Sequence, residues 1–194
     1  MASSVAILGV GLLLLVGLAL LVGLLVVVGF NKLRRADIGA QEALGGIDVQ
    51  LTRRADLIPN LVNTVKGYAA HERGVFEEVT AARAGAQAAA KDGTVEQKAA
   101  AQAALDSAVV KVLAVAEAYP ELKASANFLE LQRQLAETED QLSFARQFYN
   151  DAVGRLNELV STIPWMLFAG LASVGRREFY KAPEAQLASP TVQF

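Results

Sequence analysis

Apolar residues occupy almost every position from Val5 to Phe30, and this run contains no charged residue. About 20 such residues suffice to carry a helix across the hydrocarbon core of a bilayer. The pattern therefore predicts a transmembrane helix near the start of the chain, which would attach the protein to a membrane.

Behind this run the apolar residues recur at steps of three and four, and no stretch alternates apolar and polar residues with a period of two. Such spacing places the apolar residues on one face of a helix. The longest face, between Glu121 and about Val160, comprises Phe128, Leu131, Leu135, Thr138, Leu142, Ala145, Tyr149, Ala152, Leu156 and Leu159. Its spacing is typical of a coiled-coil seam.

Two more helical segments precede the seam. One spans about residues 94–118, and Thr94 is its candidate N-cap. The other spans about residues 57–91, and the following Asp92-Gly93 marks a break between two antiparallel helices.

The first helical segment, about residues 31–55, can continue the transmembrane helix. Pro59 has no backbone N–H and is expected to kink or divide the next turn. Alanine, leucine, glutamine, glutamate and arginine dominate this part of the chain, and all of them favour helix. We therefore predict an all-α fold, in which an N-terminal transmembrane helix precedes a long antiparallel helical bundle of about four helices with coiled-coil-like packing.

The same pattern divides the chain into three parts. Residues 1–30 form the anchor, residues 31–162 the antiparallel bundle, and residues 163–194 an apolar and basic cap segment with an extended tail. About 160 residues are enough for one domain with its own core.

Basic residues follow the apolar run and do not precede it. Lys32, Arg34 and Arg35 flank its end, whereas Met-Ala-Ser-Ser before it carries no lysine or arginine. Because positive residues favour the cytoplasmic side, we expect a single-pass protein of the bacterial inner membrane, with its N-terminus outside and its bundle in the cytoplasm. A cleaved signal peptide would have a basic start and a shorter apolar stretch.

Composition restricts the chemistry. The chain has no cysteine, which excludes disulfides, thiolate metal sites and cysteine nucleophiles. Its net charge of −2, from 18 basic and 20 acidic residues, gives no strongly basic field for nucleic acid. We expect a lipid bilayer as partner and no nucleic acid.

The sequence contains no phosphate-binding loop, nucleophile elbow or dinucleotide fingerprint. His71-Glu72 cannot form a zinc site of the two-histidine kind, because the chain has one histidine. Carboxylates at Glu77-Glu78 and from Glu137 to Asp140 have the chemistry of a magnesium or calcium site, but solvated helix faces account for them more simply. We predict a non-enzymatic protein with no catalytic residue, cofactor or metal.

Polar residues interrupt the apolar pattern between residues 48 and 72. The candidate subunit or partner contacts there are Arg53, Arg54, Asp56, Asn60 and Asn63. All but Arg54 fall on one stripe of a helix. In one interpretation Asp56 pairs with an arginine, and the two asparagines satisfy backbone groups that Pro59 leaves free. In others the stripe fixes the register between neighbouring bundles or binds a small ligand.

A second apolar segment runs from Ile163 to Leu171 and is too short to span a membrane. Its candidate contact residues are Trp165 and Phe168. The segment can lie at the membrane interface, plug a neighbouring subunit, or cap the open end of its own bundle. Val192 and Phe194 near the end of the tail are further candidate contacts.

Several separated strings resemble the LemA family. The first runs from Asp48 to Glu72 and begins Asp-Val-Gln-Leu-Thr-Arg-Arg-Ala-Asp. The others follow in the family's order: Tyr119 to Ala124, Asn127-Phe128, Glu137 to Glu139, Ala145-Arg146, Tyr149-Asn150 and Pro190 to Phe194. One departure is Leu44 with Gly45-Gly46, where related sequences often carry a tryptophan. The resemblance implies an N-terminal anchor, a membrane-tethered antiparallel helical bundle and no established enzymatic activity.

Two functions fit these features. In the first, anchored bundles associate laterally as a homo-oligomer, and this scaffold organises or shapes membrane or recruits membrane proteins. Tethering raises the local concentration, so that weak lateral contacts suffice. In the second, the protein is a single-pass adaptor or sensor whose bundle binds a partner protein or a small ligand.

Overall fold

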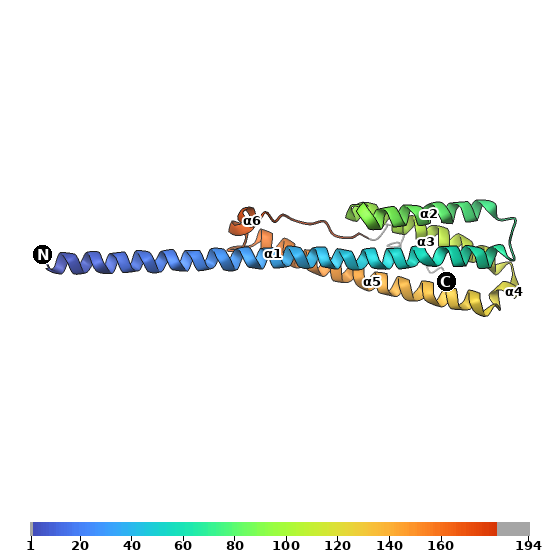
Figure 1. Ribbon diagram of the computed structural model, residues 1–194, viewed down its shortest axis with the longest axis horizontal. Helices are drawn as coiled ribbons and strands as arrows, with labels where there is room; N and C mark the ends of the chain where they lie inside the picture. The colour runs from blue at the N-terminus through green and yellow to red at the C-terminus, as the bar shows by residue number, and fades with distance from the viewer. Residues whose placement is uncertain (1, 182–194) are drawn as a thin grey trace, which may run out of the picture. The chain divides into compact units, whose positions relative to one another are not determined.

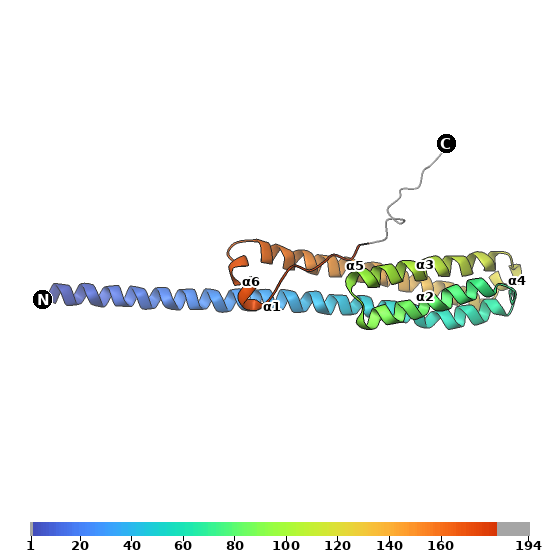
Figure 2. The same ribbon diagram turned by 90° about the horizontal axis from the view of Figure 1, so that it is seen from above.

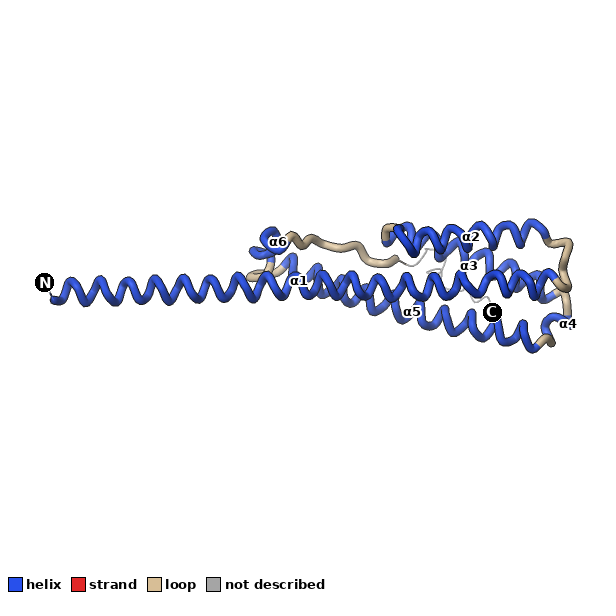
Figure 3. The backbone as a smooth tube through the Cα atoms, viewed as in Figure 1, coloured by secondary structure: helices blue, strands red, loops and turns tan. Residues whose placement is uncertain are grey.

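The computed structural model describes residues 2–181, with side chains from residue 11 onward. Its six helices are α1 (Ala2–Lys66), α2 (Arg73–Asp92), α3 (Val95–Glu117), α4 (Pro120–Lys123), α5 (Ala126–Ser161) and α6 (Met166–Ala172) (Figure 1). No strand occurs between residues 2 and 181 (Figure 3). The predicted all-α fold with a long N-terminal helix is confirmed. Besides four long helices, the short helix α4 lies between α3 and α5, and the short helix α6 follows α5.

These elements form two compact units. One contains residues 2–40 together with residues 152–177, and the other contains residues 41–151 together with residues 178–181. In the second unit the later part of α1, then α2, α3 and the first part of α5, run side by side in alternating directions (Figures 1 and 2).

The predicted seam on α5 faces inward. All ten of its residues except Ala145 and Leu159 are buried. In the second unit, Phe128 and Leu135 join a core that α1 and α3 fill with Leu61, Val65, Leu105 and Val112. Burial of apolar side chains along a regular stripe therefore holds α5 in the bundle.

Helix α3 begins after Thr94, the N-cap that the sequence predicted. The Thr94 hydroxyl accepts a hydrogen bond from the Gln97 backbone N–H at 3.2 Å, and the Gln97 side chain accepts one from the Thr94 N–H at 2.8 Å. This reciprocal capping box satisfies two donors that the first helical turn leaves free. The predicted break between α2 and α3 lies at Gly93-Thr94.

The expectation of one helix over residues 57–91 is wrong. Helix α1 ends at Lys66, and residues 67–72 connect it to α2. The Tyr68 and Ala69 N–H groups both donate to the Val65 carbonyl, at 3.0 and 2.9 Å, which closes the helix end. Ala69 and Phe76 are both buried, so apolar residues on either side of the connection mimic one continuous helical face.

Pro59 does not divide α1, which continues to Lys66. A proline cannot donate to the carbonyl four residues earlier, and here that carbonyl belongs to Ala55. The Arg83 side chain donates from Nε to the Ala55 oxygen at 3.0 Å. A neighbouring helix therefore supplies the missing donor, whereas the sequence suggested Asn60 and Asn63 for this role.

Two of the described helices, α1 and α3, are long and apolar enough to cross a membrane. A third of the apolar window of α3 is buried, and its Leu105, Val109 and Val112 belong to the core. The apolar window of α1 is not buried at all. Exposed apolar surface of this extent is typical of a membrane segment, which makes α1 the candidate membrane helix and α3 a core helix.

Candidate functional site

The predicted membrane-flanking residues and the second apolar segment meet in one unit. Lys32, Arg34 and Arg35 are exposed on α1 directly after its apolar run. The Lys32 ammonium lies over the Trp165 ring, 4.0 Å from its centroid. The Phe168 ring packs on Gly29 so closely that no Cβ would fit there. Residues 163–171 are therefore attached to the end of the apolar run of α1.

Further contacts hold the chain that follows α6. The Arg177 Nε donates to the Asp37 carboxylate at 2.7 Å. Asn157 on α5 donates to the Arg177 carbonyl and accepts from the Arg177 N–H, both at 2.9 Å. Asn150 makes the same pair of bonds with Tyr180, at 3.0 and 2.8 Å. These two asparagines were not among the predicted contact residues. Their spacing of two helical turns on α5 is the signal that they act alike.

The predicted polar stripe on α1 is exposed. Arg53, Asp56, Asn60 and Asn63 all face solvent. Arg53 lies 3.8 Å from Glu137 on α5, and Asp56 accepts a 3.4 Å hydrogen bond from Gln87 on α2. Exposed pairs of this kind contribute little to stability, so the stripe remains available for contacts outside its own chain.

Arg54 points into the bundle, away from the stripe. It is buried and pairs with Asp106 on α3 at 3.0 Å and with Glu139 on α5, which also pairs with Arg146 at 3.2 Å. Burial raises the pKa of Asp106 above its usual range, and Arg54 opposes that shift. The arrangement is an internal ion-pair network that joins three helices.

Two more buried polar contacts lie in the same unit. The Tyr180 hydroxyl donates to the Gln102 side chain at 2.8 Å, and burial raises the pKa of this phenol well above its usual range. The Lys98 ammonium donates to the Ala89 and Ala90 carbonyls, at 3.0 and 2.9 Å, and to Asp48 at 2.5 Å. The Ala90 carbonyl lies in the last turn of α2, whose carbonyls lack an intrahelical donor, whereas the Ala89 carbonyl also accepts from the Gly93 N–H.

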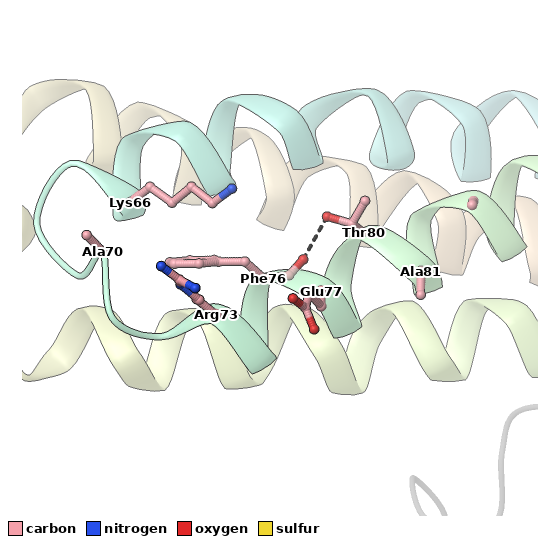
Figure 4. A pocket seen from close by; sticks show the side chains of 8 residues that line it. Lys66, Ala70, Arg73, Phe76, Glu77, Thr80 and Ala81 are labelled. Carbon is pink, nitrogen blue, oxygen red and sulfur yellow. Dashed lines mark hydrogen bonds between the residues drawn. The ribbon is translucent and has the colours of Figure 1, made fainter.

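An open groove of about 670 Å³ lies where α1 ends and α2 begins. Lys66 and Arg73 point toward the Phe76 ring there, and the Lys66 ammonium is 5.4 Å from the ring centroid (Figure 4). Glu77 and Thr80 complete the polar lining, whereas alanines make up the rest. The groove has the chemistry to hold a small or extended ligand with an anionic group, but it presents no nucleophile paired with a base.

His71 is exposed, and within residues 2–181 no group of three or more histidine, aspartate or glutamate residues lies close enough to hold a metal ion. Val192 and Phe194, the remaining predicted contacts, lie outside the described residues.

A sequence model of the LemA family matches residues 43–194. The chain is also similar to magnetosome protein MamQ 1 and magnetosome protein MamQ 2 of Paramagnetospirillum magneticum, with 26% identity over 161 residues in each case. It is 23% identical over 164 residues to magnetosome protein MamQ of Magnetospirillum gryphiswaldense.

These alignments cover 71–73% of the chain but only 59–60% of the relatives. The chain therefore spans less than two thirds of the length of the relatives it matches. Neither the family name nor the names of the relatives denotes an enzyme.

Proposed function

Because this chain belongs to the LemA family, we propose that it is a non-enzymatic scaffold, anchored in a membrane by α1, whose bundles associate laterally. The scaffold organises or shapes the membrane or recruits other membrane proteins. The bundle lies on the cytoplasmic side, in agreement with the basic residues after the apolar run.

One observation carries this proposal. Helix α1 continues from its exposed apolar run into the bundle, where it presents an exposed polar stripe. Anchored copies share one bilayer, and each copy carries the same stripe. Tethering raises the effective concentration of the copies, and weak polar contacts then suffice for assembly.

The first test is the mass and shape of the full-length chain in mild detergent, measured by light scattering and by electron microscopy of the same peak. A large, regular particle is the expected result. A monodisperse monomer would contradict the scaffold.

Charge reversals test the stripe itself. Arg53→Glu and Asp56→Arg should each reduce assembly, and their combination should restore it if the two residues pair across the interface. Lys111→Glu is the matched control, because Lys111 forms an exposed 2.6 Å pair with Glu78 away from the stripe. Equal loss in the control would show that the reversals act on the fold.

The groove between α1 and α2 favours a second function, that of an adaptor or sensor. Its paired cations beside an aromatic ring suit a partner segment or small ligand that carries an anionic group. Capture of one stoichiometric partner from membranes, lost in Arg73→Glu and retained in Arg53→Glu, would favour this function over the scaffold.

A further inference from the structure

The segment that contains α6 has an exposed apolar face. Leu167 and Leu171 lie one turn apart on α6 and are 70% and 62% exposed, and Ile163 in the preceding turn is 78% exposed. No charged residue occurs from Leu159 to Gly175. Soluble surfaces rarely leave such a face uncovered, so this face requires an apolar neighbour outside the described chain.

The opposite side of the segment fixes its position along α1. Phe168 packs on Gly29, and Lys32 lies over Trp165. Both contacts belong to one compact unit, which includes α1 up to residue 40. The exposed face is therefore held where the apolar run ends and the basic residues begin. In a membrane-spanning helix that boundary lies at the headgroup level.

The surrounding charges suit the same location. Lys32, Arg34, Arg35 and Arg176 are exposed around the segment and its attachment to α1. Basic residues beside an apolar surface with tryptophan are the features of segments that lie in the interface of an anionic membrane.

We propose that residues 163–171 form a second membrane contact, which lies in the headgroup region of the bilayer that α1 spans. This inference rests on the membrane anchor in the proposed function. The segment is too short to cross the membrane. Instead, Ile163, Leu167 and Leu171 enter the boundary between headgroups and acyl chains, while Lys32 and Arg176 contact anionic headgroups. The contact adds a second attachment point beside α1.

The test uses Trp165, the only tryptophan in the chain. Full-length protein is reconstituted in vesicles that contain anionic lipid and phospholipid brominated at a shallow or a deep acyl position. Shallow bromine should quench the emission about two-fold or more, because interfacial tryptophan lies near the headgroups. Deep bromine and aqueous iodide should quench it less.

A double variant, Leu167→Glu with Leu171→Glu, should lose the bromine quenching and gain quenching by iodide. Phe144→Glu is the matched control, since Phe144 is 67% exposed on α5 in the other unit and should leave Trp165 unchanged. Vesicle flotation is measured on every sample. Loss of flotation would contradict the anchor itself.

Two other results would contradict the proposed interfacial contact without contradicting the membrane anchor. Flotation with iodide quenching and no bromine quenching would show that the segment faces water. Protection from both quenchers, relieved when the protein is diluted with lipid, would show that a second copy covers it.

Discussion

The Ala55 carbonyl depends on a side chain from another helix, because Pro59 cannot donate to it. Removal of that donor in Arg83→Met should lower the free energy of unfolding by about 1–2 kcal/mol, the cost of an unsatisfied polar group. In a Pro59→Ala background the alanine N–H reaches the same carbonyl, so Arg83→Met should cost much less. Urea unfolding of the four chains measures the coupling.

The control for this cycle is Arg53→Met. Arg53 is exposed and makes only a 3.8 Å contact with Glu137, so its loss should be close to neutral in both backgrounds. Equal costs of Arg83→Met with and without Pro59 would show that Arg83 contributes through packing alone.

Arg54 compensates the buried carboxylate of Asp106. Burial raises the Asp106 pKa above its ordinary value of 3.8, so the folded state binds the proton more tightly than the unfolded state. The folded protein therefore loses stability as the pH rises from 3.8 through the higher pKa of the folded state. Arg54→Met removes the largest opposing charge. At pH 7 the variant should lose about 3 kcal/mol, and near pH 4 it should lose less.

Denaturant unfolding across this pH range distinguishes the ion pair from packing. The charged and titratable groups around Asp106 are Arg54 on α1, Glu139 and Arg146 on α5, and Tyr180, and the uncharged Gln102 side chain donates to its carboxylate at 3.4 Å. Glu139 keeps Arg146 as a partner in the variant. Adding Asp106→Asn to Arg54→Met should therefore abolish the pH dependence of the loss, and its persistence would assign the effect to another group.

At the scale of the elements, α6 depends on one glycine of α1. A Cβ at residue 29 would overlap the Phe168 ring, whereas the same atom at Gly23 meets nothing within 4 Å. Gly29→Ala should displace α6 and speed amide hydrogen exchange over Met166–Ala172. Gly23→Ala has a similar effect on helix propensity and should leave that exchange unchanged. Equal exchange in the two variants would contradict the contact.

The sequence predicted the helices well where the residues that determine them are close together in the chain. Thr94 and Gln97 are three residues apart and cap α3 as expected, and the seam spacing placed eight core residues of α5 correctly. The break at residues 67–72 was missed because the buried apolar residues Val65, Ala69 and Phe76 keep a helix-like spacing across it, although Gly67 is a poor helix former. Pro59 was expected to kink or divide α1, and it does not divide the helix. The donor to the Ala55 carbonyl is Arg83, which lies 28 positions from Ala55 in the sequence.

The candidate sites likewise could not be predicted where they depend on contacts between residues far apart in the sequence. The stripe of Arg53, Asp56, Asn60 and Asn63 follows from helical spacing, but the sequence did not predict that it is exposed. Arg54 was predicted as a subunit or partner contact outside this stripe, but its side chain is buried and pairs within its own bundle. The contacts of Trp165 with Lys32 and of Tyr180 with Gln102 join residues 133 and 78 positions apart. Only the folded chain brings such residues together.

At the scale of the whole molecule, the apolar run and the folded units are energetically separate. Residues 12–25 are all exposed and contribute no side chain to the core. A chain that lacks residues 2–25 should therefore keep its free energy of unfolding within about 0.5 kcal/mol. Thermal unfolding followed by circular dichroism, against the full chain in detergent, measures this. A broad or lower transition would show that the run stabilises the fold.

The shortened chain also separates the two proposed membrane contacts. It retains the apolar face of residues 163–171 and the basic residues beside it, which attract anionic lipid by about 1 kcal/mol each near the surface. We expect it to bind anionic vesicles weakly and to dissociate from them in high salt, because salt screens that attraction. It should not bind neutral vesicles. Leu167→Glu with Leu171→Glu in the shortened chain should abolish the binding, because the attraction of the basic residues to anionic lipid then remains without the burial of apolar side chains. If the variant still binds as tightly, the basic residues act without the segment, and residues 163–171 are not an apolar attachment to the membrane.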